Sequence, residues 1–74
     1  MAYEKEAVEA LHAIAMDITR MVVERQRAID ALTLFPHESM GAFKDIVKKV
    51  ELGVLRERAE LYMTRFEAGM EHAT

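Results

Sequence analysis

The sequence contains no cysteine, no tryptophan and only one proline in 74 residues. Without cysteine the chain can form neither a disulfide nor a thiolate metal site. A chain this short buries little surface, and such chains commonly depend on a disulfide, a metal or a second copy. The three histidines, His12, His37 and His72, lie far apart and show no metal-ligand spacing. We therefore expect no metal site, no cofactor, and a homodimer.

The sequence also lacks a long apolar run and a strong charge of either sign. No run approaches the roughly 20 apolar residues that span a bilayer. The segment from Met1 to Glu6 is acidic and does not show the basic-then-apolar order of a secretory signal. Hydrophobic residues make up 51% of the chain, too many for a disordered protein, and the net charge of −3 disfavours nucleic-acid binding. We expect a folded cytoplasmic protein with no membrane partner.

The distribution of helix breakers predicts an all-α fold. Pro36 is the one strong breaker, and only Gly53 and Gly69 interrupt the long runs around it. Because no segment alternates with period two, strands are not expected. We predict one domain over residues 1–74, an antiparallel hairpin with a helix over about 3–33, a turn over about 34–38 and a helix over about 39–71. The second helix starts either with Ser39 as its N-cap or earlier, with Pro36 in its first turn.

The first predicted helix carries one broad apolar stripe. Its members recur at spacings of three and four residues, as in a helix of a bundle: Ala7, Val8, Leu11, Ile14, Ala15, Ile18, Met21, Val22, Ala28, Ile29 and Leu32. Arg25 interrupts this stripe. Its side chain is expected to extend toward solvent or to form an ion pair across an interface.

The second predicted helix carries two apolar stripes, separated by about 140° at 100° per residue. The first contains Met40, Phe43, Ile46, Val47, Val50, Val54 and Leu61. The second, with its neighbour Met63, contains Leu52, Leu55, Ala59, Tyr62, Phe66 and Met70. One stripe suffices to cover the first helix, so the other requires a partner. The partner is either a second copy, which would complete a four-helix bundle, or a larger protein.

The sequence favours a binding function over catalysis. No set of histidines and carboxylates converges on one helix face, so we expect no catalytic site. We predict a non-enzymatic interaction module that docks a helix onto a larger protein, as an adaptor or as a regulator of the anti-activator or phage-inhibitor type. This link rests on size and fold class. The alternatives are a secretion-type chaperone and a Rop-like RNA-binding dimer. The latter would use the mixed charges between Lys44 and Arg58.

Overall fold

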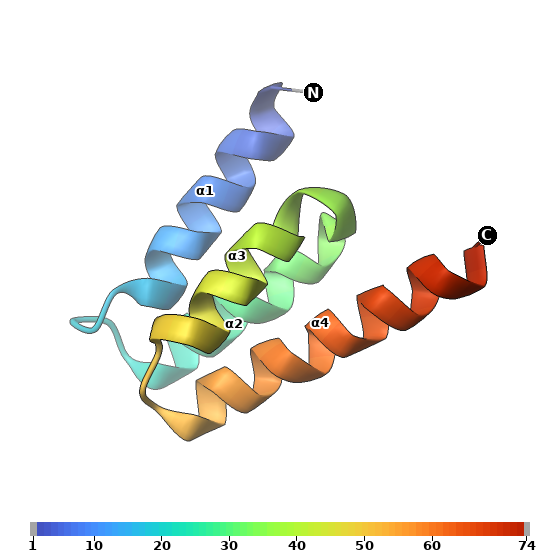
Figure 1. Cartoon of the computed structure of the whole chain (residues 1–74). Helices are drawn as coiled ribbons and strands as arrows, with labels where there is room; N and C mark the ends of the chain where they lie inside the picture. Colours follow the sequence, from blue (N-terminus) through green and yellow to red (C-terminus); the bar gives the residue numbers. More distant parts are fainter. Residues whose placement is uncertain (1, 74) are drawn as a thin grey trace.

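The chain folds into four helices rather than two. The computed structural model describes the backbone of residues 2–73 and the side chains of residues 3–69. The helices are α1 (Ala2–Met16), α2 (Val22–Ala31), α3 (Pro36–Lys49) and α4 (Gly53–Ala73), with a 3₁₀ turn (Leu32–Leu34) after α2 (Figure 1). The predicted all-α class is confirmed. The predicted two-helix hairpin, with helices over about 3–33 and 39–71, is wrong because each long helix is broken in its middle.

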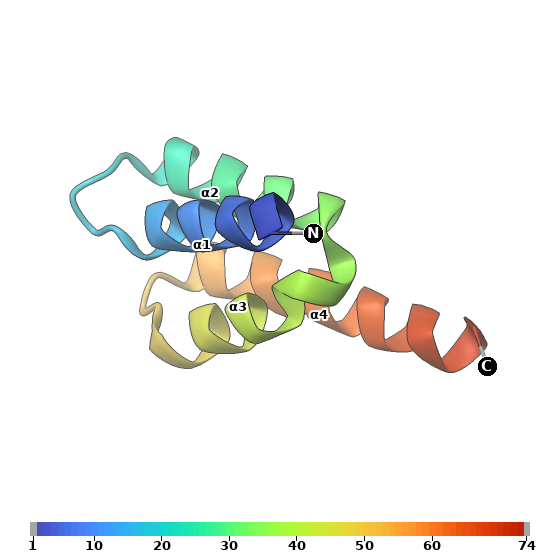
Figure 2. The same cartoon turned by 90° about the horizontal axis from the view of Figure 1, so that it is seen from above.

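The four helices form two stacked layers. Figure 2 shows α1 and α2 together above α3 and α4. Helix α1 packs against α2 and α3, and α4 packs against the same two helices. A four-helix arrangement, which the sequence predicted for two copies, is therefore formed within one chain. Association of two copies stays a prediction.

The first break, between α1 and α2, is made by polar side chains. The Asp17 carboxylate accepts hydrogen bonds from the Thr19 backbone N–H at 2.9 Å and from its hydroxyl at 2.6 Å. Such a local turn competes with the helix for backbone groups. Met21 is extended (ψ 147°), and its N–H donates to the Glu24 carboxylate at 3.2 Å, so α2 begins at the next residue. The helix therefore ends without a proline or glycine.

The second break lies between α3 and α4, over residues 50–52. Val50 is extended (ψ 121°), which ends α3. The Leu52 carbonyl accepts the N–H groups of Leu55 and Arg56, both at 3.1 Å, and α4 starts at Gly53. Glycine is a poor interior helix residue, so its position at this boundary is favourable. The chain reverses here, and α4 packs alongside α3.

The junction near Pro36 lies where the sequence predicts a turn. Pro36 occupies the first turn of α3, where its fixed φ is favourable and its missing N–H costs nothing. Of the two predicted starts, the earlier one is confirmed. Ser39 is not an N-cap: it is fully buried, and its hydroxyl donates to the Leu32 carbonyl at 2.8 Å.

The core lies between the two layers and draws on all four helices. Its largest fully buried apolar side chains are Ile29, Leu32, Phe43, Ile46 and Leu55. Smaller residues, including Ala15, Ala28, Ala42 and Ala59, let the helices approach closely. Within the described residues, no helix has the length and apolar character needed to cross a membrane.

Candidate functional site

Most of the residues expected at an interface contribute to the core of a single chain. Leu55 and Ala59 are fully buried. Tyr62, Met63 and Phe66 are partly buried against the core. The reversal at residues 50–52 directs this stripe of α4 toward α2 and α3. The prediction that the stripe requires a partner is therefore wrong for its buried members.

Two further interface candidates have different outcomes. Leu52 precedes α4 and remains 43% exposed, so it is available for binding. The side chain of Met70 lies outside the described residues. The structure therefore leaves Leu52 as the one strongly exposed member of the expected interface among residues 3–69.

Aromatic packing holds α4 against α3. The Phe43 ring lies 5.6 Å from the Phe66 ring and 6.1 Å from the Tyr62 ring, measured between centroids, at tilted angles. Such tilted pairs stabilise a fold beyond their buried area. Tyr62 and Phe66 thus have a structural role in the chain itself.

An ion pair connects α4 to α2. The Arg58 guanidinium binds both oxygens of the Asp30 carboxylate, and the Tyr62 hydroxyl donates to the same carboxylate at 2.7 Å. Burial opposes ionisation of Asp30, but the hydrogen bonds from Arg58 and Tyr62 outweigh it and lower the pKa of Asp30. The hydrogen bond to Asp30, together with burial, raises the pKa of Tyr62. The cluster is a structural link between the two layers.

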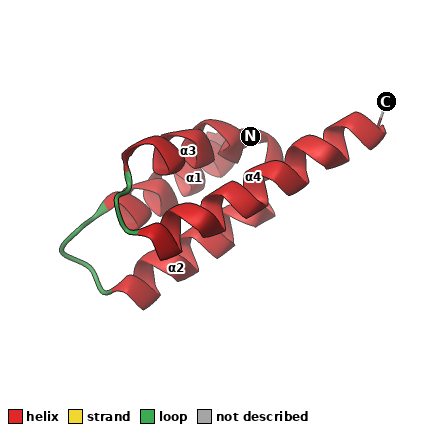
Figure 3. Ribbon diagram, turned by 60° about the horizontal axis from the view of Figure 1, so that its bottom comes forward, coloured by secondary structure: helices red, strands yellow, loops and turns green. Residues whose placement is uncertain are grey.

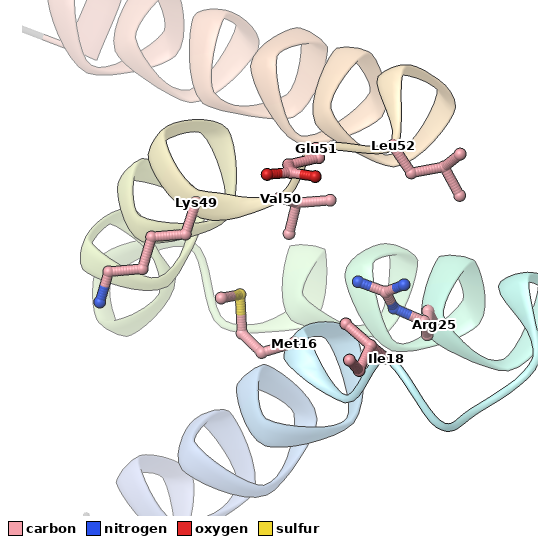
Figure 4. A pocket seen from close by; sticks show the side chains of 7 residues that line it. All are labelled: Met16, Ile18, Arg25, Lys49, Val50, Glu51 and Leu52. Carbon is pink, nitrogen blue, oxygen red and sulfur yellow. The ribbon is translucent and has the colours of Figure 1, made fainter.

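The two helix breaks lie at the same end of the molecule (Figure 3). Between them is an open cavity of about 670 Å³, which we call the loop-end cavity. Figure 4 shows the side chains around it, which come from both breaks and from the helix ends beside them. They are Met16, Ile18, Arg25, Lys49, Val50, Glu51 and Leu52. This volume falls in the range of ordinary ligand pockets, about 300–1,000 Å³.

Apolar side chains project into solvent beside this cavity. Ile18 is 84% exposed and Met21 is 67% exposed, and both lie on the short connection between α1 and α2. With Leu52 we call them the loop-end rim. The sequence placed Ile18 and Met21 in the buried stripe because their spacing continues that of Leu11. The Asp-x-Thr turn and Glu24 were the signals that could have excluded them from the stripe.

Arg25 lines the cavity and is only 7% exposed. Its Nε donates to the Ala15 carbonyl at 2.8 Å, one of the carbonyls that α1 leaves free at its C-terminus. The negative end of the α1 dipole stabilises the buried cation. Among the described residues, no carboxylate lies within ion-pair distance of Arg25. The predicted extension toward solvent is wrong, and an ion pair across an interface stays a prediction.

The other charged groups near the cavity are engaged elsewhere or exposed. Lys49 pairs with Asp45 at 2.9 Å, and Asp45 also contacts His12 at 2.8 Å. The hydrogen bond from Lys49 is the main cause that lowers the pKa of Asp45. Hydrogen bonds from Thr19 lower the pKa of Asp17, with a smaller contribution from the Arg25 charge. Arg25 therefore supplies a positive charge that no carboxylate contacts directly within the described chain.

Of the six lysines and arginines of α3 and α4, two form ion pairs among the described residues, whereas Lys44, Lys48, Arg56 and Arg65 are exposed. Lys49 pairs with Asp45 and Arg58 pairs with Asp30. Nucleic-acid binding depends on several unpaired cations that can neutralise phosphates together. Over residues 3–69 there is also no cluster of three histidine, aspartate or glutamate side chains arranged to hold a metal ion.

The loop-end cavity and its rim thus form the strongest candidate site of the described chain. Comparison of the chain with protein-family models, with curated protein sequences and with solved structures gives no significant match.

Proposed function

We propose that the chain is a non-enzymatic interaction module that binds a segment of a larger protein at its loop end. The main support is the exposure of Ile18, which lines the loop-end cavity, and of Met21 on the same connection. The cavity walls combine apolar side chains with the charged residues Arg25, Lys49 and Glu51. Apolar side chains on a short connection gain nothing from the fold, and their burial by a partner is favourable. Methionine is also able to adapt its shape to a partner.

The proposed binding mode differs from docking through the second stripe of α4. Most residues of that stripe are buried in the chain's own core. The loop end, in contrast, combines exposed apolar side chains with a cavity. A regulator, inhibitor or adaptor of this kind would act by covering a segment that its partner needs for another contact. The four packed helices serve as the rigid support for the two connections.

A paired substitution experiment tests this proposal. The tagged wild-type chain, Ile18→Asp and the control Leu34→Asp are used to capture proteins from nuclease-treated extract of the source cells. Leu34 is a matched control because it is 75% exposed and belongs to the 3₁₀ turn that follows α2, whereas Ile18 lies on the connection that precedes α2. We expect one protein to be retained by the wild type and by Leu34→Asp and lost with Ile18→Asp.

Loss of the captured protein with Leu34→Asp alone would contradict the assignment to the loop end. Partners that are captured from untreated extract but not from nuclease-treated extract would instead support the RNA-binding alternative. Analytical ultracentrifugation of the purified variants tests whether the loop end instead mediates self-association. A dimer that Ile18→Asp converts to a monomer would assign the loop end to self-association, as the sequence analysis predicted for the chain in general.

A further inference from the structure

We propose that Arg25 binds the C-terminal carboxylate of the partner segment, while the last side chain of that segment occupies the apolar part of the loop-end cavity. This inference rests on the proposed function and specifies the chemistry of the ligand. It starts from the guanidinium of Arg25, which lines the cavity and which Figure 4 shows extending from α2 into the space between the helix breaks.

The hydrogen bonds of Arg25 leave its terminal nitrogens for a ligand. Nε is used by the Ala15 carbonyl, and neither terminal nitrogen has an acceptor among the described residues. No fully buried side-chain nitrogen of the described chain lacks a partner, so these terminal nitrogens keep some accessible surface, and Arg25 lines the cavity. A guanidinium presents two parallel N–H groups along such an edge, which matches the two oxygens of a carboxylate.

The fixed position of Arg25 makes it a suitable anion-binding group. Its side chain is held by the bond to Ala15 and is only 7% exposed. Binding a carboxylate would therefore order few additional rotamers. Interactions between opposite charges are also stronger in such a partly desolvated position than on an open surface. The exposed Lys49 ammonium is held by Asp45 and contributes less.

The walls of the cavity indicate what else the ligand carries. Met16, Val50 and Leu52 supply apolar surface around the guanidinium. A chain terminus carries its carboxylate and its last side chain on the same carbon, so one apolar residue satisfies both features. It also enters a recessed site end-on, which a segment from the middle of a chain does less easily. A C-terminal apolar residue is therefore the ligand that fits best.

The test is an NMR titration of the full-length ¹⁵N-labelled chain with three short probes. The first is N-acetyl-Ala-Ala-Leu as the free acid, the second is the same peptide as its C-terminal amide, and the third is N-acetyl-Ala-Leu-Glu amide. The readouts are the side-chain N–H signals of Arg25 and the backbone amides of residues 16–18 and 50–52. We expect the free acid to shift these signals saturably, with an affinity about tenfold or more above that of either amide.

Equal affinity of the free acid and its amide would overturn the role of Arg25 but would leave apolar docking at the loop end intact. Equal affinity of the glutamate probe would show that a side-chain carboxylate is bound, which contradicts the choice of a chain terminus. If no probe shifts the loop-end signals and Ile18→Asp captures the same proteins as the wild type, the inference and the proposed function both fail.

Two variants distinguish the contribution of the guanidinium geometry to carboxylate affinity from the contribution of its positive charge. Arg25→Lys keeps the positive charge but lacks the planar pair of donors, so the preference for the free acid should fall severalfold. Because Arg25 is buried, Glu51→Gln provides a second variant on an exposed residue. It removes a negative charge from the cavity wall and should strengthen binding of the free acid without affecting its amide. Unchanged affinities in Glu51→Gln would contradict an electrostatic contribution at this site.

Discussion

The two ends of the helical bundle differ in how their side chains are used. Toward the Pro36 junction, Leu32, Ser39 and Phe43 are fully buried, and the Ser39 hydroxyl donates to the Leu32 carbonyl. At the loop end, apolar side chains are exposed and a buried cation lines a cavity. Leu34 is exposed near the Pro36 junction as well, but under the proposed function the buried residues there serve stability and the loop end serves binding. Substitutions at the two ends should therefore separate stability from binding.

The largest effect is expected for Phe43→Ala. The ring is fully buried and contacts both Tyr62 and Phe66. Removing such a ring costs about 3–5 kcal/mol, which is comparable to the whole stability of a small domain. We expect the helical circular-dichroism signal to be lost or to unfold at a much lower urea concentration. A urea midpoint like that of the wild type would contradict the assigned core.

A smaller loss of stability is expected for Ser39→Ala. The substitution leaves the Leu32 carbonyl without the hydroxyl that it binds at 2.8 Å. Loss of one buried hydrogen bond should lower the free energy of unfolding by about 1–2 kcal/mol. The control Thr64→Ala changes an exposed hydroxyl on α4 and should leave the urea midpoint nearly unchanged. Equal shifts of the urea midpoint for the two substitutions would contradict the hydrogen bond between Ser39 and Leu32.

The ion pair between the layers predicts a pH dependence of stability. The pKa of Asp30 is lower in the folded chain than its usual value of 3.8. Its contribution is therefore complete above the unfolded pKa and is lost as pH falls through the lower folded pKa. Because the pair is partly exposed, we expect about 1 kcal/mol at most. Urea unfolding of wild type and Asp30→Asn should differ near pH 7 and converge toward pH 2. A difference that grows on acidification would refute this linkage.

The smallest effect on stability is expected at the loop end. Ile18 is 84% exposed, so Ile18→Asp should change the free energy of unfolding by no more than about 0.5 kcal/mol. The same variant is expected to abolish partner binding. A loss of stability comparable to that of Phe43→Ala would mean that Ile18 belongs to the core after all. Thermal unfolding of the two variants side by side checks this contrast.

The sequence predicts the all-α class and one of the three junctions between helices, the one near Pro36. Local signals in the sequence explain why this junction is predicted and the other two are not. Helical periodicity and the position of Pro36 suffice for an all-α chain with a junction near residue 35. The break after α1 is hidden because Ile18 and Met21 match the spacing of the buried stripe on both sides. It depends on weaker signals, the Asp17 turn and the Glu24 contact with Met21, which compete with helix propensity.

The candidate site could not be predicted from the sequence because it forms only where the two helix breaks bring distant residues together. Arg25 stands out in the stripe, but its contact with Ala15 requires α2 to fold back along α1. Likewise, the second stripe of α4 has no partner within a continuous helix, and it packs on α2 and α3 only because residues 50–52 reverse the chain. Gly53 marks that reversal, although glycine within a long apolar pattern is also tolerated inside helices. Leu52 alone combines a predicted interface role with strong exposure among the described residues.

Under the proposed function, the loop end, and not the rest of the surface, contacts the partner. Photo-crosslinking tests it most directly, with a benzophenone amino acid placed at position 18 in one variant and at position 34 in the other. Both positions are highly exposed, and they lie on the connections before and after α2. We expect a crosslink to one larger protein from position 18 and none from position 34. A crosslink from position 34 alone would contradict it.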